Sequence, residues 1–200
     1  RMEIDAAAFE AWECEPCTIG FELVKLRDLI GLAEQGDLIE MNYDENDGRV
    51  NIQVGEINRT IRPLDRATML EPRVPDVDLQ SSVKLSAVKF SRALRAAKQV
   101  GDLATISLNA QSFGVNVSGD TDTVNVSYDA GELQDLVCDG PVKSQYSLSL
   151  LYPMAKRMEA IVDSVALFFN ENHPLRLEFE FADGAGRCVY FLAPRIEGDA

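Results

Sequence analysis

A repeated unit, one helix followed by three strands, most strongly constrains the fold of this 200-residue chain. Apolar residues recur with a helical period over 22–35, 86–100 and 149–161, so that each predicted helix begins roughly 60–65 residues after the last. Alternation of apolar and polar residues predicts three strands after each helix. These strands are expected at 37–43, 49–54, 58–65, 103–110, 114–118, 123–129, 164–169, 175–182 and 187–193. Helices on one face of antiparallel sheets indicate an α+β fold whose copies bury one another's apolar faces.

The segments before and after the first helix-plus-strands copy define the expected domains. The first five residues alternate like the last strand of a further copy, and the chain opens on Arg1 rather than Met, so we expect it to be N-terminally incomplete. Residues 64–79 carry Pro72 and Pro75, mixed charges and no sustained period, which predicts an extended linker. We therefore expect a partial first domain over 1–65, a connector over 66–79 and a complete second domain over 80–200.

The chain is acidic, with a formal net charge of −14 and 33 Asp and Glu residues against 19 Lys and Arg. Such a surface suits a protein that works at high salt, and it equally suits simple solubility. A strongly acidic protein repels nucleic acid unless its few basic groups gather on one surface. No apolar run approaches the roughly 20 residues that span a bilayer.

One predicted helix does gather basic residues. Between Asp78 and Asp102 there is no acidic residue, yet this window holds five of the 19 basic residues. They are Lys84, Lys89, Arg92, Arg95 and Lys98. On the helical wheel Phe90, Leu94 and Ala97 form a buried stripe, and the bases of the helix fan across the opposite half. A solvated face of this chain should be acidic, so we favour a surface that faces phosphate without reading base sequence.

Two helices repeat this tendency more weakly, because their bases have acidic neighbours. The bases are Lys25, Arg27, Lys156 and Arg157. No aromatic residue interleaves with any of these groups, so nothing indicates stacking on single-stranded bases.

Motifs that carry chemistry are missing from the sequence. It holds no phosphate-binding loop, no nucleophile elbow and no paired zinc-ligating histidines, since His173 is its only histidine. We expect no enzyme activity, no cofactor and no metal.

Cys14 and Cys17 form a C-x-x-C pair, but the next helix is expected to begin about five residues later, too far for its dipole to lower a thiol pKa. Glu13 and Glu15 should raise that pKa instead. Two thiols in a loop are therefore the favoured interpretation, and a redox protein remains a distant alternative.

Specific motifs accompany the repeat. A segment near the C-terminus reads Tyr190-Phe191-Leu192-Ala193-Pro194-Arg195-Ile196-Glu197, the basic helix 87–100 is followed by Gly101-Asp102, and a turn reads Ser118-Gly119-Asp120. Together with the proline-bearing connector, these features resemble the sliding clamps of archaea and eukaryotes, the proliferating cell nuclear antigen family. The resemblance covers essentially the whole chain. Members of that family carry a further helix and strands before the position of Arg1, which would account for the odd number of copies.

The resemblance implies a DNA-clamp fold and a ring of three two-domain subunits, with helices lining a central hole. It implies a DNA polymerase sliding clamp, or processivity factor, that encircles duplex DNA independently of sequence. Short peptide motifs would tether DNA polymerase, clamp loader, ligase and flap endonuclease. The protein would be a homotrimer when full length, cytoplasmic in an archaeon or nuclear in a eukaryote.

The resemblance also assigns residues to surfaces. The bases above would face DNA. A pocket for partner peptides would be formed by Met69, Leu70, Val74, Phe191, Leu192, Ala193 and Pro194. Subunits would join through two edge strands, at Ile57, Asn58, Arg59 and Thr60 and at Thr123, Val124, Asn125 and Val126. Two alternatives stay open: a clamp-like subunit of a checkpoint ring, and an oligomeric scaffold that does not bind DNA.

Overall fold

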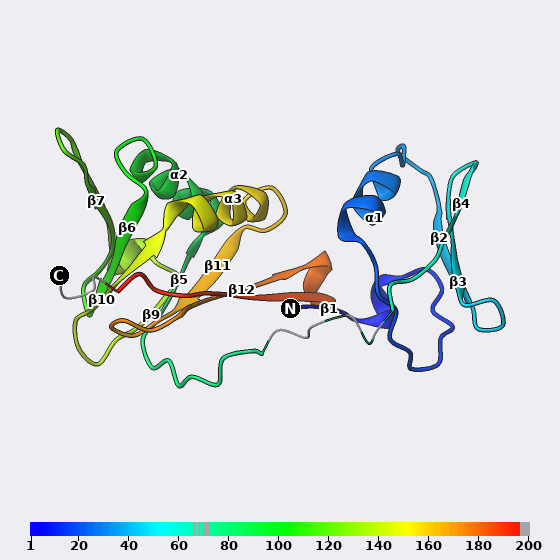
Figure 1. The fold of residues 1–200 in the computed structure, drawn as a ribbon. Helices are drawn as coiled ribbons and strands as arrows, with labels where there is room; N and C mark the ends of the chain where they lie inside the picture. Colours follow the sequence, from blue (N-terminus) through cyan, green and yellow to red (C-terminus); the bar gives the residue numbers. More distant parts are fainter. Residues whose placement is uncertain (66, 68, 70–72, 197–200) are drawn as a thin grey trace. The chain divides into compact units, whose positions relative to one another are not determined.

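The computed structural model describes residues 1–65, 67, 69 and 73–196 (Figure 1). The chain forms two compact units: residues 1–12 cluster with 74–200, and residues 13–73 form a smaller unit. Among the described residues, no helix is long and apolar enough to cross a membrane.

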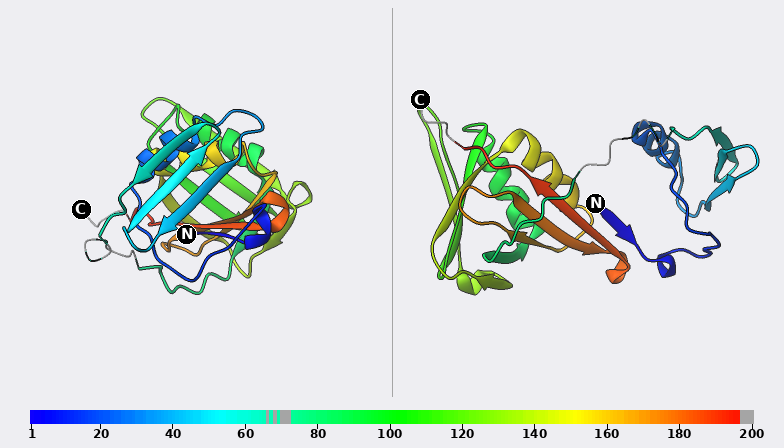
Figure 2. Two further views of the ribbon diagram at one scale, coloured as in Figure 1. Left: turned by 90° about the vertical axis from the view of Figure 1, so that its right-hand side faces the viewer. Right: turned by 60° about the horizontal axis from the view of Figure 1, so that its bottom comes forward.

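The larger unit contains two antiparallel sheets. The four-stranded sheet has the order β10-β6-β7-β8 and the six-stranded sheet the order β1-β13-β12-β11-β5-β9. The strands of the first are β6 Leu103–Asn109, β7 Ser112–Ser118, β8 Thr123–Asp129 and β10 Val142–Ser147. Those of the second are β1 Met2–Ile4, β5 Ser82–Ser86, β9 Asp135–Val137, β11 Ser164–Phe168, β12 Leu175–Phe181 and β13 Gly186–Leu192. Two helices, α2 (Ala87–Ala97) and α3 (Leu148–Met158), lie side by side against these strands (Figures 1 and 2).

Helix α2 forms where its sequence predicts. The hydroxyl of Ser86 accepts a hydrogen bond from the backbone N–H of Lys89 and so caps the first turn. Phe90, Leu94 and Ala97 are fully buried, which confirms the predicted stripe. They belong to one core shared by both helices and both sheets. Burial of a side chain as large as Phe90 or Leu94 contributes roughly 1.5–3 kcal/mol.

The smaller unit packs α1 (Leu23–Ile30) against a three-stranded antiparallel sheet of order β2-β3-β4. Its strands are β2 Ile39–Asp44, β3 Arg49–Val54 and β4 Ile57–Ile61. β3 alternates as predicted, with Val50, Ile52 and Val54 buried against Leu29 of the helix.

The repeated element contains more strands than the sequence predicted. All three predicted helices and all nine predicted strands are present, although the helices are shorter than expected. Three further strands, β5, β9 and β10, were not predicted from the sequence. β5 and β10 run directly into α2 and α3 without an intervening turn, so no Gly or Pro signal separates strand from helix. Each of these two helices therefore has a strand directly before it as well as the predicted strands after it.

The first strand, β1, belongs to the larger unit, although the residues from 13 onward form the smaller one. β1 pairs with β13, with Met2 opposite Cys188 and Ile4 opposite Gly186, so the start of the chain extends the six-stranded sheet. In Figure 1 the blue strand β1 adjoins the red strand β13. The compact units consequently differ from the expected boundaries, because residues 1–12 group with the C-terminal part.

Candidate nucleic-acid interface and subunit edges

The exposed face of α2 is basic. Lys89, Arg92, Arg95 and Lys98 are all exposed, opposite the buried stripe of the same helix. Lys84 does not share this face. It lies on β5 between Val83 and Leu85, which point into the core, so alternation directs Lys84 to the side of the sheet away from the helices. The structure thus separates Lys84 from the four bases with which it was grouped.

The four bases of α2 differ in their partners. Lys89 Nζ lies 3.1 Å from Glu132 Oε1, and Lys98 pairs with Asp102. Within the described ranges, no carboxylate lies within ion-pairing distance of Arg92 or Arg95. The two arginines are therefore the residues of this face whose charge is open to an external anion.

Glu132 is held in place by a small network. It forms a capping box with Asp129, whose backbone N–H donates to Glu132 Oε2 over 3.2 Å. The hydrogen bond from Lys89, together with the bond from Asp129, lowers the pKa of Glu132. The hydroxyl of Tyr128 donates to the carbonyl of Lys89 over 2.9 Å, and Lys89 Nζ lies 5.5 Å from the centre of the tyrosine ring. Burial raises the pKa of Tyr128, which further favours the protonated form that donates this hydrogen bond.

Sequence reasoning missed Tyr128 and Glu132 because both are about 40 positions from Lys89. The spacing of Asp129 and Glu132 matches a capping box and could have indicated a fixed glutamate.

The basic residues of α1 are paired with nearby carboxylates, whereas those of α3 are exposed. On α1, Lys25 pairs with Glu22 at 2.6 Å and Arg27 with Asp28 at 2.6 Å, so their charges are locally balanced. On α3, Lys156 and Arg157 are exposed and follow one another in the last turn.

Both strands expected at subunit contacts lie at sheet edges. β4 is the outermost strand of the three-stranded sheet and β8 that of the four-stranded sheet. Each therefore has one side whose backbone N–H and C=O groups make no ladder within its own sheet. The side chains of Ile57, Asn58, Arg59 and Thr60 on β4 are exposed, and those of β8 alternate between exposed and half-buried.

The residues expected to form the peptide pocket have unequal access to solvent. Met69 and Val74 are exposed, at 43% and 57%, whereas Leu70 lies outside the described residues. Near the C-terminus Ala193 is exposed, and Phe191 and Pro194 are half-buried. Leu192 is 5% exposed and belongs to the core, so its role is to support this segment from beneath.

A backbone hydrogen bond also holds the C-terminal segment in place. The N–H of Arg195 donates to the carbonyl of Gln145 over 2.7 Å, which joins the end of the chain to β10.

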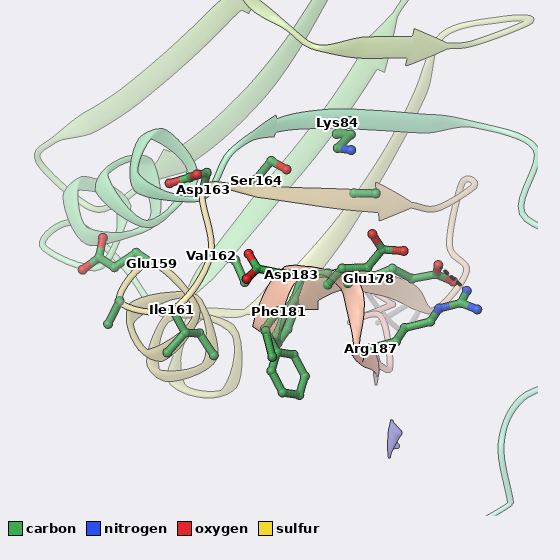
Figure 3. Close-up of a pocket in the computed structure, with 16 residues that line it drawn as sticks. Lys84, Glu159, Ile161, Val162, Asp163, Ser164, Glu178, Phe181, Asp183 and Arg187 are labelled. Carbon is green, nitrogen blue, oxygen red and sulfur yellow. Dashed lines mark hydrogen bonds and ion pairs between the residues drawn. The ribbon is translucent and has the colours of Figure 1, made fainter. Parts of the chain in front are cut away.

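A pocket of about 680 Å³ lies elsewhere, where the end of α3 meets β12 and β13 (Figure 3). Its lining includes Lys84, Asp163 and Asp183, and Glu178 pairs there with Arg187 at 2.7 Å. Over the described part of the chain, no group of three or more His, Cys, Asp or Glu side chains could hold a metal ion. This pocket includes none of the residues assigned to partner peptides.

Comparisons with known proteins identify the family of this chain. Residues 73–195 match the sequence model of the proliferating cell nuclear antigen C-terminal domain. The chain is 36% identical over 199 residues to the DNA polymerase sliding clamp of Methanosarcina mazei, covering 99% of this chain and 80% of the relative. It is 33% identical over 201 residues to the clamp of Natronomonas pharaonis, covering 99% and 81%. This chain belongs to the proliferating cell nuclear antigen family.

Solved structures of this family confirm the expected fold class. The A. fulgidus PCNA bound to the C-terminal region of FEN-1 superposes with a TM-score of 0.90 at 24% identity, covering 99% of this chain and 80% of that one. The Entamoeba histolytica protein superposes with a TM-score of 0.85 at 20% identity, covering 98% and 79%. The α+β class predicted from the repeat and the clamp fold implied by the resemblance are therefore confirmed.

Proposed function

We propose that this chain is a subunit of a DNA polymerase sliding clamp, a ring that encircles duplex DNA and tethers replication and repair proteins. The observation that carries the proposal is the basic face of α2 on a chain of net charge −14. A ring held on DNA by its topology needs only weak and mobile attraction to phosphate, and stronger binding would impede sliding. As a tether, the protein performs no chemistry of its own.

The basic face supplies that attraction through a few contacts. Arg92 and Arg95 lack carboxylate partners among the described residues and would meet phosphate first. Lys89 and Lys98 would contribute when phosphate displaces Glu132 and Asp102. Lys25, Arg27, Lys156 and Arg157 would contribute less.

The experiment is a polymerase processivity assay on primed circular DNA with a clamp loader. Changing Lys89, Arg92 and Arg95 together to Ala should shorten the products and weaken loading, because three phosphate contacts are lost. Thermal stability should stay near that of the unmodified protein, since all three side chains are exposed. Unchanged processivity would show that this face does not meet DNA.

Three subunits would close the ring by pairing β4 of one subunit with β8 of the next. A pairing of the same kind occurs within the chain, between β1 and β13. β1 and β13 are each the last strand of a repeated copy, and they pair antiparallel. β4 and β8 are the last strands of the other two copies, and each has an open edge. Pairing β4 with β8 of a neighbour would repeat between chains the contact that β1 and β13 make within one.

The pairing of β1 with β13 also supports a register for this contact. A 3-10 turn preceded by Asp5 follows β1, as one preceded by Asp129 follows β8, so Met2 corresponds to Val126. A proline follows β4 and β13 at the same distance, so Ile57 corresponds to Cys188. Because Met2 lies opposite Cys188, we expect Val126 opposite Ile57 of the neighbour.

The same register places Asn125 opposite Asn58. Arg1 and Val189, the corresponding pair within the chain, exchange both backbone hydrogen bonds at 2.8 Å. Asn125 would therefore donate to the neighbouring subunit, and Val126 and Ile57 would form the closer, non-hydrogen-bonded pair.

By sequence repeat rather than by compact unit, we divide the chain for this function into a partial first clamp domain over 1–65, a connector over 66–79 and a second clamp domain over 80–200; residues 1–12 pack with the second of these. The connector and the C-terminal segment would hold short peptides that carry a glutamine and two aromatic residues. The A. fulgidus clamp bound to the C-terminal region of FEN-1 supports a flap endonuclease as one partner. Polymerase, clamp loader and ligase would use the same site.

A further inference from the structure

Two exposed cysteines have no role in the proposed clamp. Cys14 and Cys17 lie with their sulfur atoms 3.8 Å apart, just after the boundary where the chain enters the smaller unit. The thiol of Cys14 also donates to the carbonyl of Glu15 over 3.0 Å. Both side chains occupy a stretch without helix or strand, where rotation of the side chains is not opposed by core packing.

The other two cysteines are placed differently. Cys188 is buried in the core, and the thiol of Cys138 donates to the carbonyl of Gly140 over 2.7 Å. The pair lacks the further ligands that a structural zinc site needs, since the described residues contain no group of three metal-ligating side chains. The chemistry left to the pair is that of two neighbouring thiols.

We propose that Cys14 and Cys17 form a reversible dithiol–disulfide site that low-molecular-weight disulfides oxidise, with cationic ones preferred to anionic ones. One cysteine thiolate attacks a sulfur of the small disulfide and expels one small thiolate, which leaves a mixed disulfide. The second cysteine thiolate attacks the cysteine sulfur of that mixed disulfide and expels the other small thiolate. The two cysteines are oxidised by two electrons, and the small disulfide is reduced to two thiols that take up the two protons.

The surroundings of the pair set its preference. Glu13 and Glu15 flank Cys14, and the pKa of Cys17 is raised by its hydrogen bond with Cys14, by desolvation and by the nearby charges, including that of Glu45. A raised pKa leaves less thiolate at neutral pH, so oxidation should accelerate as pH rises. The carboxylates repel an anionic disulfide and attract a cationic one.

Peptide mapping tests the proposal directly. Cleavage after Lys and Arg releases both cysteines in one peptide, residues 2–25, while Cys138 and Cys188 fall in two others. The native protein is treated with cystamine, a cationic disulfide, and the remaining thiols are alkylated. The peptide 2–25 should become two hydrogen atoms lighter and take up no alkyl group, and dithiothreitol should reverse the change.

Variants separate this outcome from simple thiol reactivity. Cys17→Ser should stop at a stable mixed disulfide on Cys14, whereas Cys138→Ser, the matched control, should oxidise like the unmodified protein. If both cysteines remain open to alkylation at a cystamine concentration that modifies Cys14 of the Cys17→Ser variant, the pair does not close and the proposal is wrong.

The charge preference has its own test. At low salt, cystamine should oxidise the pair at least about threefold faster than oxidised glutathione, and added salt should reduce the difference. Equal rates at low salt would overturn the preference for cationic disulfides.

Discussion

At the scale of single residues, Glu132 and Asp102 pair with lysines of α2, and we expect them to compete with DNA phosphate for these side chains. Glu132 pairs with Lys89 and is itself anchored by Asp129, so Lys89 reaches phosphate only by giving up this partner. The lowered pKa of Glu132 keeps it charged at neutral pH. The pairing is therefore present above the ordinary pKa of glutamate and is lost as pH falls through the lowered value.

Glu132→Gln should consequently strengthen the salt-dependent attraction to DNA. Freeing one lysine should steepen the dependence of log affinity on log salt by up to about 0.9, the value for one further phosphate contact. Fluorescence anisotropy with duplex DNA over a salt series measures this slope. Asp139→Asn makes the same change in net charge at an exposed carboxylate that is not part of this network, and it should leave the slope nearly unchanged. Identical slopes for the two variants would contradict the competition.

Pro194 carries a second prediction at this scale. It is half-buried at the end of the segment that Leu192 supports from the core. Pro194→Ala should weaken binding of a synthetic partner peptide, measured by calorimetry, by about 1 kcal/mol or more if the residue is part of the binding hot spot. Val137→Ala, at an exposed site on β9, is the control and should bind normally. Normal affinity in the Pro194 variant, with unchanged thermal stability, would argue against the pocket.

Single residues also show what the sequence could and could not predict. Phe90, Leu94 and Ala97 were correctly predicted as buried, because helical periodicity depends only on local spacing. Lys84 was grouped with the helix because it is close in sequence, but it lies on a strand that was not predicted, and so it points to the opposite side of the sheet. The link between Lys89 and Glu132 joins distant positions, which periodicity alone cannot bring together.

At the scale of elements, the sequence predicted strands best where turns bound them. The bounds of β3 and β8 agree with the prediction at both ends. β5 and β10 were missed because each continues into a helix, and β9 because it has only three residues. The pairing of β1 with β13 joins the two ends of the chain, a relation that no local pattern encodes.

The edge strands provide the prediction at this scale. With Ile57→Cys and Val126→Cys in one chain, mild oxidation should link neighbouring subunits, because residues at a non-hydrogen-bonded position have close side chains. Non-reducing electrophoresis should show covalent dimers and trimers. Ile57→Cys with Asn125→Cys moves the second cysteine by one residue, to the other face of the strand, and should link poorly. Efficient linking of this control but not of the first variant would show that the register is wrong.

Asn125→Pro tests the same contact without cross-linking. Proline removes the backbone N–H that β8 would donate to the neighbour, so the variant should sediment as a monomer while keeping its fold. A stable trimer of this variant would be inconsistent with the proposed ladder.

At the scale of the whole molecule, an acidic protein that carries one basic helix face is explained by a ring that holds DNA through topology. The most direct measurement compares retention on closed and opened DNA. The clamp is loaded on nicked circular DNA by its loader, separated from unbound protein by gel filtration, and the DNA is then cut once with a restriction enzyme. The protein should stay with circular DNA and be lost from linear DNA, because a ring slides off the ends. Equal retention on circular and linear DNA would contradict topological retention, since it would mean that the protein is held by direct binding.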